Sequence, residues 1–215
     1  MSRLSPQAGI ALGPILFMLA LLGVIAAVMS ASGGGGFNVA GTADRVNADV
    51  SNQANLIRSK INECYMQYVT NGVNNSAAPC AGDAYPCSDQ TNGSLVSSLT
   101  CPGDPLISGA QQSIWTGLRV TLLPQPSTGF TPWFYMNAGD AGGRCIWTSP
   151  GSSTATTWTA PANGNNNSGV VEGLKLAAAK FSSQEASYIH ASTSQKFVVF
   201  ITRPTGTTDS HCSVP

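Results

Sequence analysis

Residues 10–29 read IALGPILFMLALLGVIAAVM, an apolar stretch with no charged residue and no Ser, Thr, Asn or Gln. No Asp, Glu, Lys or Arg occurs between Arg3 and Asp44. About 20 apolar residues, each rising about 1.5 Å, match a hydrocarbon core of roughly 30 Å. We therefore predict a transmembrane helix at 10–32. Arg3, in a short leader at 1–9, favours a cytoplasmic N-terminus, which places the rest of a single-pass protein on the periplasmic side of the inner membrane.

A cleaved secretory signal peptide is the alternative interpretation of this stretch. Arg3 would then be its charged region, and the small residues Ser30, Ala31 and Ser32 would mark the cleavage site. The apolar core of a signal peptide usually runs about 7 to 15 residues. A run near 20 residues favours a retained anchor.

Four consecutive glycines at 33–36 follow the apolar stretch. Each glycine costs roughly 1 kcal/mol of helix stability relative to alanine, so a continuous helix through them is not expected. We predict a glycine-rich hinge at 33–41, followed by an exported domain at 42–215.

An amphipathic helix is predicted at 42–71, with Asn71 and Gly72 as its stop. Its apolar residues recur at spacings of three and four: Val39, Ala43, Val46, Val50, Ala54, Ile57, Ile61, Cys64 and Tyr68. The polar positions fall largely off this stripe: Asp49, Asn52, Arg58, Lys60 and Glu63. We expect the stripe to pack on the domain's own sheet rather than to pair with a separate coiled-coil partner.

A short leader ending in Gly9, a long apolar helix and an amphipathic helix together resemble the layout of type IV prepilins and pseudopilins. The likeness covers about the first 70 residues. It implies that a prepilin peptidase cuts between Gly9 and Ile10, and that the chain then joins other pilin subunits through a filament assembly machinery. The family usually has Glu at the fifth mature position, where this chain has Pro14. That departure points to a minor or tip subunit.

The composition limits the possible partners of the exported part. Charged residues make up 9% of the chain, with ten Lys and Arg against ten Asp and Glu. A balanced and sparse charge set provides no basic face for nucleic acid. The roughly 185 residues after the anchor are enough for one domain with its own core.

Six cysteines lie in the exported part: Cys64, Cys80, Cys87, Cys101, Cys145 and Cys212. An even set outside the cytoplasm predicts disulfides, although six cysteines allow 15 pairings. We predict Cys145–Cys212, which would tie the tail at 204–215 to a central strand. The other four would share two bonds that pin a long loop onto the helix. A zinc site is the alternative, but there is no CxxC motif and the nearby histidine is His211. We predict no metal and no cofactor.

The expected fold is α+β, with the amphipathic helix packed on an antiparallel sheet. The segment at 72–113 predicts a cysteine-rich loop, because it is rich in turn-forming residues and has no periodicity. Strands are predicted at 114–123, 132–137, 144–149, 186–190 and 196–203, and a second short helix at 170–181 should cover the sheet. Trp115, Trp133 and Trp147 could form a stacking surface, but burial in the sheet is the preferred interpretation.

Trp158 lies in a low-complexity segment at 150–168 and is a candidate contact for a partner or a neighbouring subunit. The sequence contains no phosphate-binding loop, metalloprotease helix motif or GxSxG. A cysteine nucleophile with His190 or His211 is conceivable, but the even cysteine set favours disulfides, and we expect no enzyme. The expected function is that of a structural filament subunit. The alternative is an anchored or secreted, adhesin-like module that recognises a glycan or a surface through Trp158 and the loops.

Overall fold

The computed structural model describes residues 17–18, 20–21, 35–76, 78–103, 111–116, 129–151, 168–191 and 194–212. The chain divides into two compact units, Met1–Gly41 and Thr42–Pro215. Most of the predicted membrane span at 10–32 lies outside the described residues; Phe17, Met18 and Leu21 are helical and exposed. Within the described part of the chain, no helix has both the length and the hydropathy that a membrane crossing requires.

The long helix α2 spans Gly35–Val69 and confirms the predicted amphipathic pattern. From Ala43 onward its apolar stripe is buried, and seven of its members are at most 3% exposed: Ala43, Val50, Ala54, Ile57, Ile61, Cys64 and Tyr68. The helix ends in a turn at the predicted stop, where the Gly72 N–H donates to the Val69 carbonyl and Gly72 adopts a positive φ of 67°. Glycine tolerates this conformation because it has no Cβ.

Two details of this region differ from the sequence predictions. Residues 35–41 are helical, although the glycine run predicted a hinge at 33–41. Gly35 and Gly36 lie in the first turn of α2, where the N–H groups have no partner within the helix in any case, so the prediction overstated their effect. Lys60 is only 8% exposed rather than on the solvent face, and its Nζ pairs with Glu63 Oε2 at 3.0 Å.

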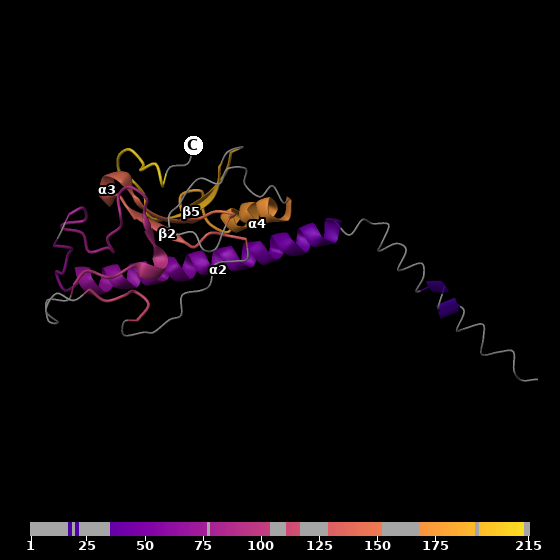
Figure 1. Cartoon of the computed structure of the whole chain (residues 1–215), viewed down its shortest axis with the longest axis horizontal. Coiled ribbons are helices and arrows are strands. Elements are labelled where there is room, and N and C mark those ends of the chain that lie inside the picture. The colour runs from indigo at the N-terminus through magenta and orange to yellow at the C-terminus, as the bar shows by residue number, and fades with distance from the viewer. Residues whose placement is uncertain are drawn as a thin grey trace, which may run out of the picture. The chain divides into compact units, whose positions relative to one another are not determined.

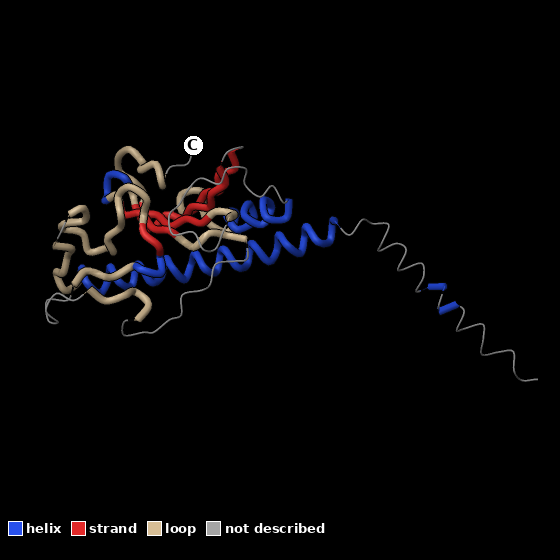
Figure 2. The backbone as a smooth tube through the Cα atoms, viewed as in Figure 1, coloured by secondary structure: helices blue, strands red, loops and turns tan. Residues whose placement is uncertain are grey.

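A five-stranded antiparallel sheet forms the second layer of the Thr42–Pro215 unit (Figures 1 and 2). The strand order is β1-β2-β3-β5-β4. The strands are β1 (Ser94–Leu95), β2 (Phe134–Asn137), β3 (Arg144–Thr148), β4 (Ala186–Ala191) and β5 (Ser194–Thr202). The described residues of this unit also include three short helical elements: a 3-10 turn η1 (Val96–Ser98), α3 (Gly139–Gly142) and α4 (Ser168–Ala179).

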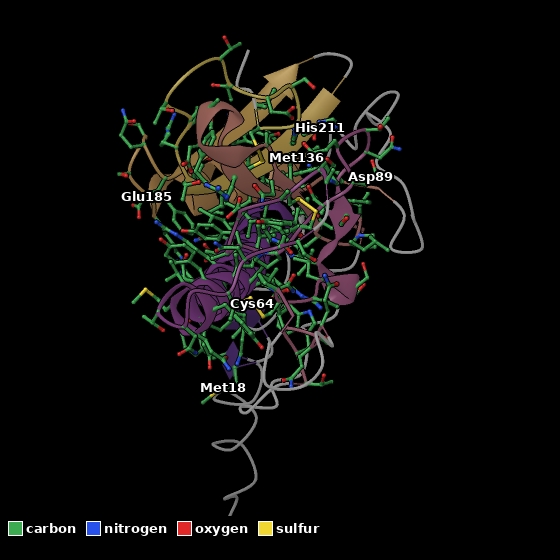
Figure 3. The ribbon with its side chains drawn as sticks, turned by 90° about the vertical axis from the view of Figure 1, so that its left-hand side faces the viewer. Met18, Cys64, Asp89, Met136, Glu185 and His211 are labelled. Atoms are coloured by element: carbon green, nitrogen blue, oxygen red, sulfur yellow. A yellow bond between two sulfur atoms is a disulfide. The ribbon has the colours of Figure 1, made fainter. Side chains whose placement is uncertain are left out.

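Both faces of the sheet are buried. On the helix-covered face, Tyr135, Ile146 and Phe197 share one apolar cluster with Ile57 of α2 and Leu174 of α4. On the opposite face, which we call the tail-covered face, a second cluster joins strand residues to the end of the chain: Phe134, Met136, Cys145, Trp147, Ile189, Val198, Phe200 and Cys212. In Figure 3, Met136 and His211 accordingly lie away from Cys64 of α2. Alternate residues of β2, β3 and β5 therefore supply two different cores.

Five of the predicted elements recur with small shifts in their ends, namely β2, β3, β4, β5 and α4. The predicted strand at 114–123 does not begin at 114, because residues 114–116 form a turn; residues 117–123 lie outside the described part. The loop predicted at 72–113 contains β1 and η1, which the sequence analysis missed. Trp115, Trp133 and Trp147 are buried, as preferred, with at most 6% exposure.

Candidate functional site

The six cysteines form three disulfides, Cys64–Cys101, Cys80–Cys87 and Cys145–Cys212. The Cys145–Cys212 prediction is confirmed, and the other four cysteines share two bonds, one of which fastens the loop to α2. Disulfides persist in oxidising compartments, so this pattern supports an extracytoplasmic domain. Because all six cysteines are bonded, none is left as a thiol nucleophile. Gly9, Ile10 and Trp158 lie outside the described residues.

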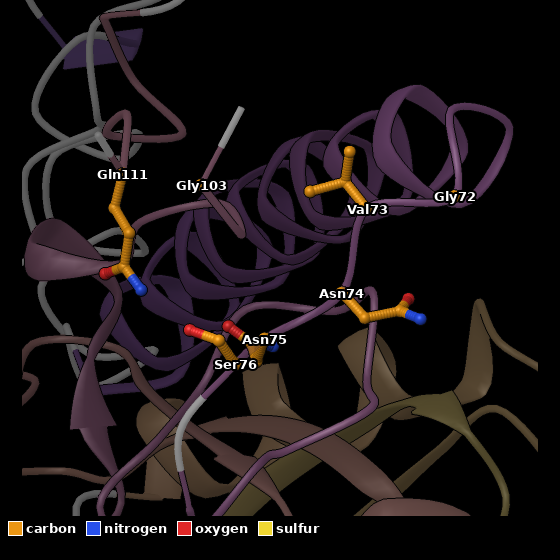
Figure 4. Close-up of a pocket in the computed structure, with 7 residues that line it drawn as sticks. All are labelled: Gly72, Val73, Asn74, Asn75, Ser76, Gly103 and Gln111. Carbon is orange, nitrogen blue, oxygen red and sulfur yellow. The ribbon is translucent and has the colours of Figure 1, made fainter. Parts of the chain in front are cut away.

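A pocket of about 310 Å³ opens at the C-terminal end of α2 (Figure 4). Residues 72–76 form one wall, and Gly103 and Gln111 line the other. The wall at 72–76 leaves the helix through the Gly72 turn, and the Val73 N–H donates to the Tyr68 carbonyl at 2.9 Å. Gly103 follows Cys101, which is bonded to α2 through Cys64. The pocket therefore lies where two segments far apart in sequence are held to the same helix.

Asn75 fixes the shape of the first wall. Its Nδ2 donates to the Asp83 carbonyl at 2.6 Å and to the Tyr85 carbonyl at 2.8 Å. The backbone adds two bonds, from the Asn75 N–H to the Asp83 carbonyl and from the Gly82 N–H to the Asn75 carbonyl, both at 2.9 Å. Asn75 is only 6% exposed, so these bonds are shielded from water and hold the wall against the loop behind it.

A buried ion cluster joins that loop to the sheet. Arg144 at the start of β3 is 5% exposed and pairs with Asp83, and its Nη1 lies 2.7 Å from Asp140 Oδ1. The guanidinium also lies 4.4 Å from the ring centroid of Tyr85. Burial opposes the charge of Arg144, but hydrogen bonds from Arg144 to Asp140 and Asp83 outweigh it and raise the Arg144 pKa. The cluster stays charged and anchors the loop behind the pocket.

The tail-covered face holds a second group of polar side chains. Lys196 is 4% exposed; its Nζ donates to the His211 carbonyl and lies 4.8 Å from the ring centroid of Trp147. His211 Nδ1 lies 2.9 Å from Asp209 Oδ1. Burial lowers the pKa of Lys196 to about 8, and the charge of Asp209 opposes the shift. These contacts of Lys196 hold the tail residue His211 against the sheet.

Sequence reasoning missed the pocket and both polar groups. Asn75, Ser76 and Gln111 are amide and hydroxyl residues in loops, and nothing in their spacing separates them from other loop residues. A usable signal existed for Arg144 and Lys196. In a chain with only 9% charged residues, a cation inside an apolar strand pattern indicates a buried partner.

No protein-family model, no curated protein and no solved structure matches this chain. The long helix packed on a five-stranded antiparallel sheet is consistent with a pilin-like fold.

Proposed function

We propose that the protein is a structural subunit of a type IV pilus-like or type II secretion-like filament, held in the inner membrane before assembly. The observation that carries this proposal is α2, a 35-residue helix whose apolar stripe packs on an antiparallel sheet. The apolar stretch at 10–29 precedes this helix in the sequence. The three disulfides fit a domain that matures outside the cytoplasm.

In this function the apolar helix is stored in the bilayer, and a prepilin peptidase removes residues 1–9. The helix then packs laterally against those of neighbouring subunits. Small residues allow close helix approach in an apolar medium, and the stretch contains Gly13, Gly23, Ala26 and Ala27. Pro14 in place of the usual acidic residue fits a minor or tip subunit.

The mass of the intact protein recovered from cells tests the processing step. A mature chain beginning at Ile10 is expected. Gly9→Val should leave the leader attached, whereas Gly23→Val should be processed normally and should reduce only the amount of subunit recovered in sheared filaments. A mature chain beginning near Ala31 or Gly33 would overturn the proposal, because the packing helix would then be lost.

A further inference from the structure

The pocket at the end of α2 is lined by neutral polar groups. Its wall residues, as far as the structure describes them, include no Asp, Glu, Lys, Arg or His. The apolar side chain in the lining, Val73, is itself only 7% exposed. A volume of about 310 Å³ lies at the lower end of the range for small-molecule sites.

Both walls are held in place before any ligand binds. Asn75 is fixed by its bonds to the Asp83 and Tyr85 carbonyls, and Cys80–Cys87 closes the loop that carries these acceptors. On the other side, Cys64–Cys101 fixes the segment that leads to Gly103. Preorganised walls lose little conformational entropy on binding, so weak polar contacts can be sufficient for recognition.

Three side chains, Gln111, Ser76 and Asn75, direct unused hydrogen-bonding groups toward one another at this pocket. Gln111 Oε1 accepts from Thr100 Oγ1 at 2.8 Å, which orients the side chain and leaves its Nε2 as a donor. Figure 4 shows the Gln111 amide pointing toward Ser76 and Asn75, whereas Asn74 points in another direction. Within the described segments, neither the Ser76 hydroxyl nor Asn75 Oδ1 takes part in a hydrogen bond. The pocket thus offers a donor, an acceptor and a group that can be either.

We infer that this pocket binds a small neutral saccharide. Sugar hydroxyls both donate and accept, so they match the amide donor of Gln111, the Ser76 hydroxyl and the acceptor of Asn75. A phosphate, a carboxylate or an amine would lack a charged partner among the described lining residues. A peptide would find only one apolar side chain, Val73, among the described lining residues. The inference concerns a binding activity and does not depend on filament assembly.

Saturation-transfer NMR on the full-length chain tests the inference. Lauryldimethylamine oxide is the suitable detergent because its head group is not a sugar. The probes are glucose, galactose, mannose and N-acetylglucosamine, with N-acetylneuraminic acid as the charged counterpart. At least one neutral sugar should show transfer, and in a titration it should shift the side-chain amide resonance of Gln111. Ser76→Ala and Gln111→Ala, which remove exposed groups, should each weaken binding about fivefold.

Asn52→Ala removes an exposed amide of α2 that does not line the pocket, so it is the matched control and should bind the same sugar with unchanged affinity. The inference is overturned if no neutral sugar shows transfer, or if the Gln111 amide resonance does not move in the unaltered protein. Sugar binding that survives both Ser76→Ala and Gln111→Ala would equally overturn the inference. So would binding that is stronger for N-acetylneuraminic acid than for the neutral sugars. Neutral hexapeptides serve as a further probe, and stronger binding of these peptides would also overturn it.

Discussion

Gly93 occupies a position where one added methyl group has no room. It precedes β1 with a φ of +72°, and a Cβ there would lie 2.5 Å from Trp147 Cη2 and 2.9 Å from the Tyr135 carbonyl oxygen. Gly93→Ala combines left-handed backbone strain with overpacking, so we expect a loss of about 2–4 kcal/mol in the free energy of unfolding. Denaturant unfolding followed by Trp fluorescence measures this loss.

Gly82→Ala is the control for Gly93→Ala, since Gly82 has a φ of +84° and nothing lies within 4 Å of the Cβ that alanine would add there. It should show the backbone strain alone, about 1–2 kcal/mol. Equal losses for the two variants would contradict the close contact with Trp147.

Lys196 gives the tail-covered face a dependence on pH. Its folded pKa, about 8, lies below its ordinary value of 10.5. The folded protein therefore binds fewer protons than the unfolded chain between these values, and stability rises with pH in that interval. We expect a gain of about 2 kcal/mol in the free energy of unfolding from pH 8 to 9.5.

The measurement must stop near pH 9.5. Burial raises the pKa of Tyr188 to about 12 and that of Tyr135 well above its ordinary value, so both reverse the trend at higher pH. Lys196→Met should give a flat profile between pH 8 and 9.5. A native protein whose stability does not change over this range would contradict the buried charge.

At the scale of elements, α2 and α4 pack closely because α4 contains a glycine at their contact. A Cβ on Gly173 would lie 2.7 Å from the Ala43 carbonyl oxygen and 2.7 Å from Val46 Cβ. Gly173→Ala gains about 1 kcal/mol of helix propensity but forces the two helices apart, so we expect a net loss of roughly 1–2 kcal/mol in the free energy of unfolding. Chemical denaturation followed by circular dichroism measures it.

Gly41→Ala makes the same chemical change in α2 where nothing lies within 4 Å of the added Cβ. It should stabilise the helix by about 1 kcal/mol. A gain in both variants would show that α4 does not touch α2 at Gly173.

The same scale shows how far the sequence determines the elements. The strands β2, β3 and β5 were predictable because each is a short apolar run bounded by turn residues, and the long helix was predictable because its apolar residues recur at spacings of three and four. The edge strand β1 was not, because Ser94–Leu95 pairs with Phe134 and Tyr135 only after the Gly93 turn brings it there. The pocket could not be predicted either, because its two walls are brought together by the Cys64–Cys101 disulfide. That pairing is one of several that the cysteine count allows.

At the scale of the whole molecule, the disulfides close loops of very different lengths. Cys145–Cys212 spans 67 residues, whereas Cys80–Cys87 spans 7. In the chain-entropy account, a cross-link stabilises mainly by restricting the unfolded chain, and the effect grows with the logarithm of the loop. The long bond should therefore contribute about 4 kcal/mol and the short one about 2 kcal/mol.

Two double variants test this ranking. Cys145→Ser with Cys212→Ser should lower the free energy of unfolding by about 2 kcal/mol more than Cys80→Ser with Cys87→Ser, measured in guanidinium chloride under the same conditions. The tail also covers Lys196, whose Nζ donates to the His211 carbonyl. The Cys145→Ser, Cys212→Ser variant should therefore also lose the rise in stability between pH 8 and 9.5. If it keeps that rise, the fold buries Lys196 without the bond, and the disulfide acts on the unfolded chain alone.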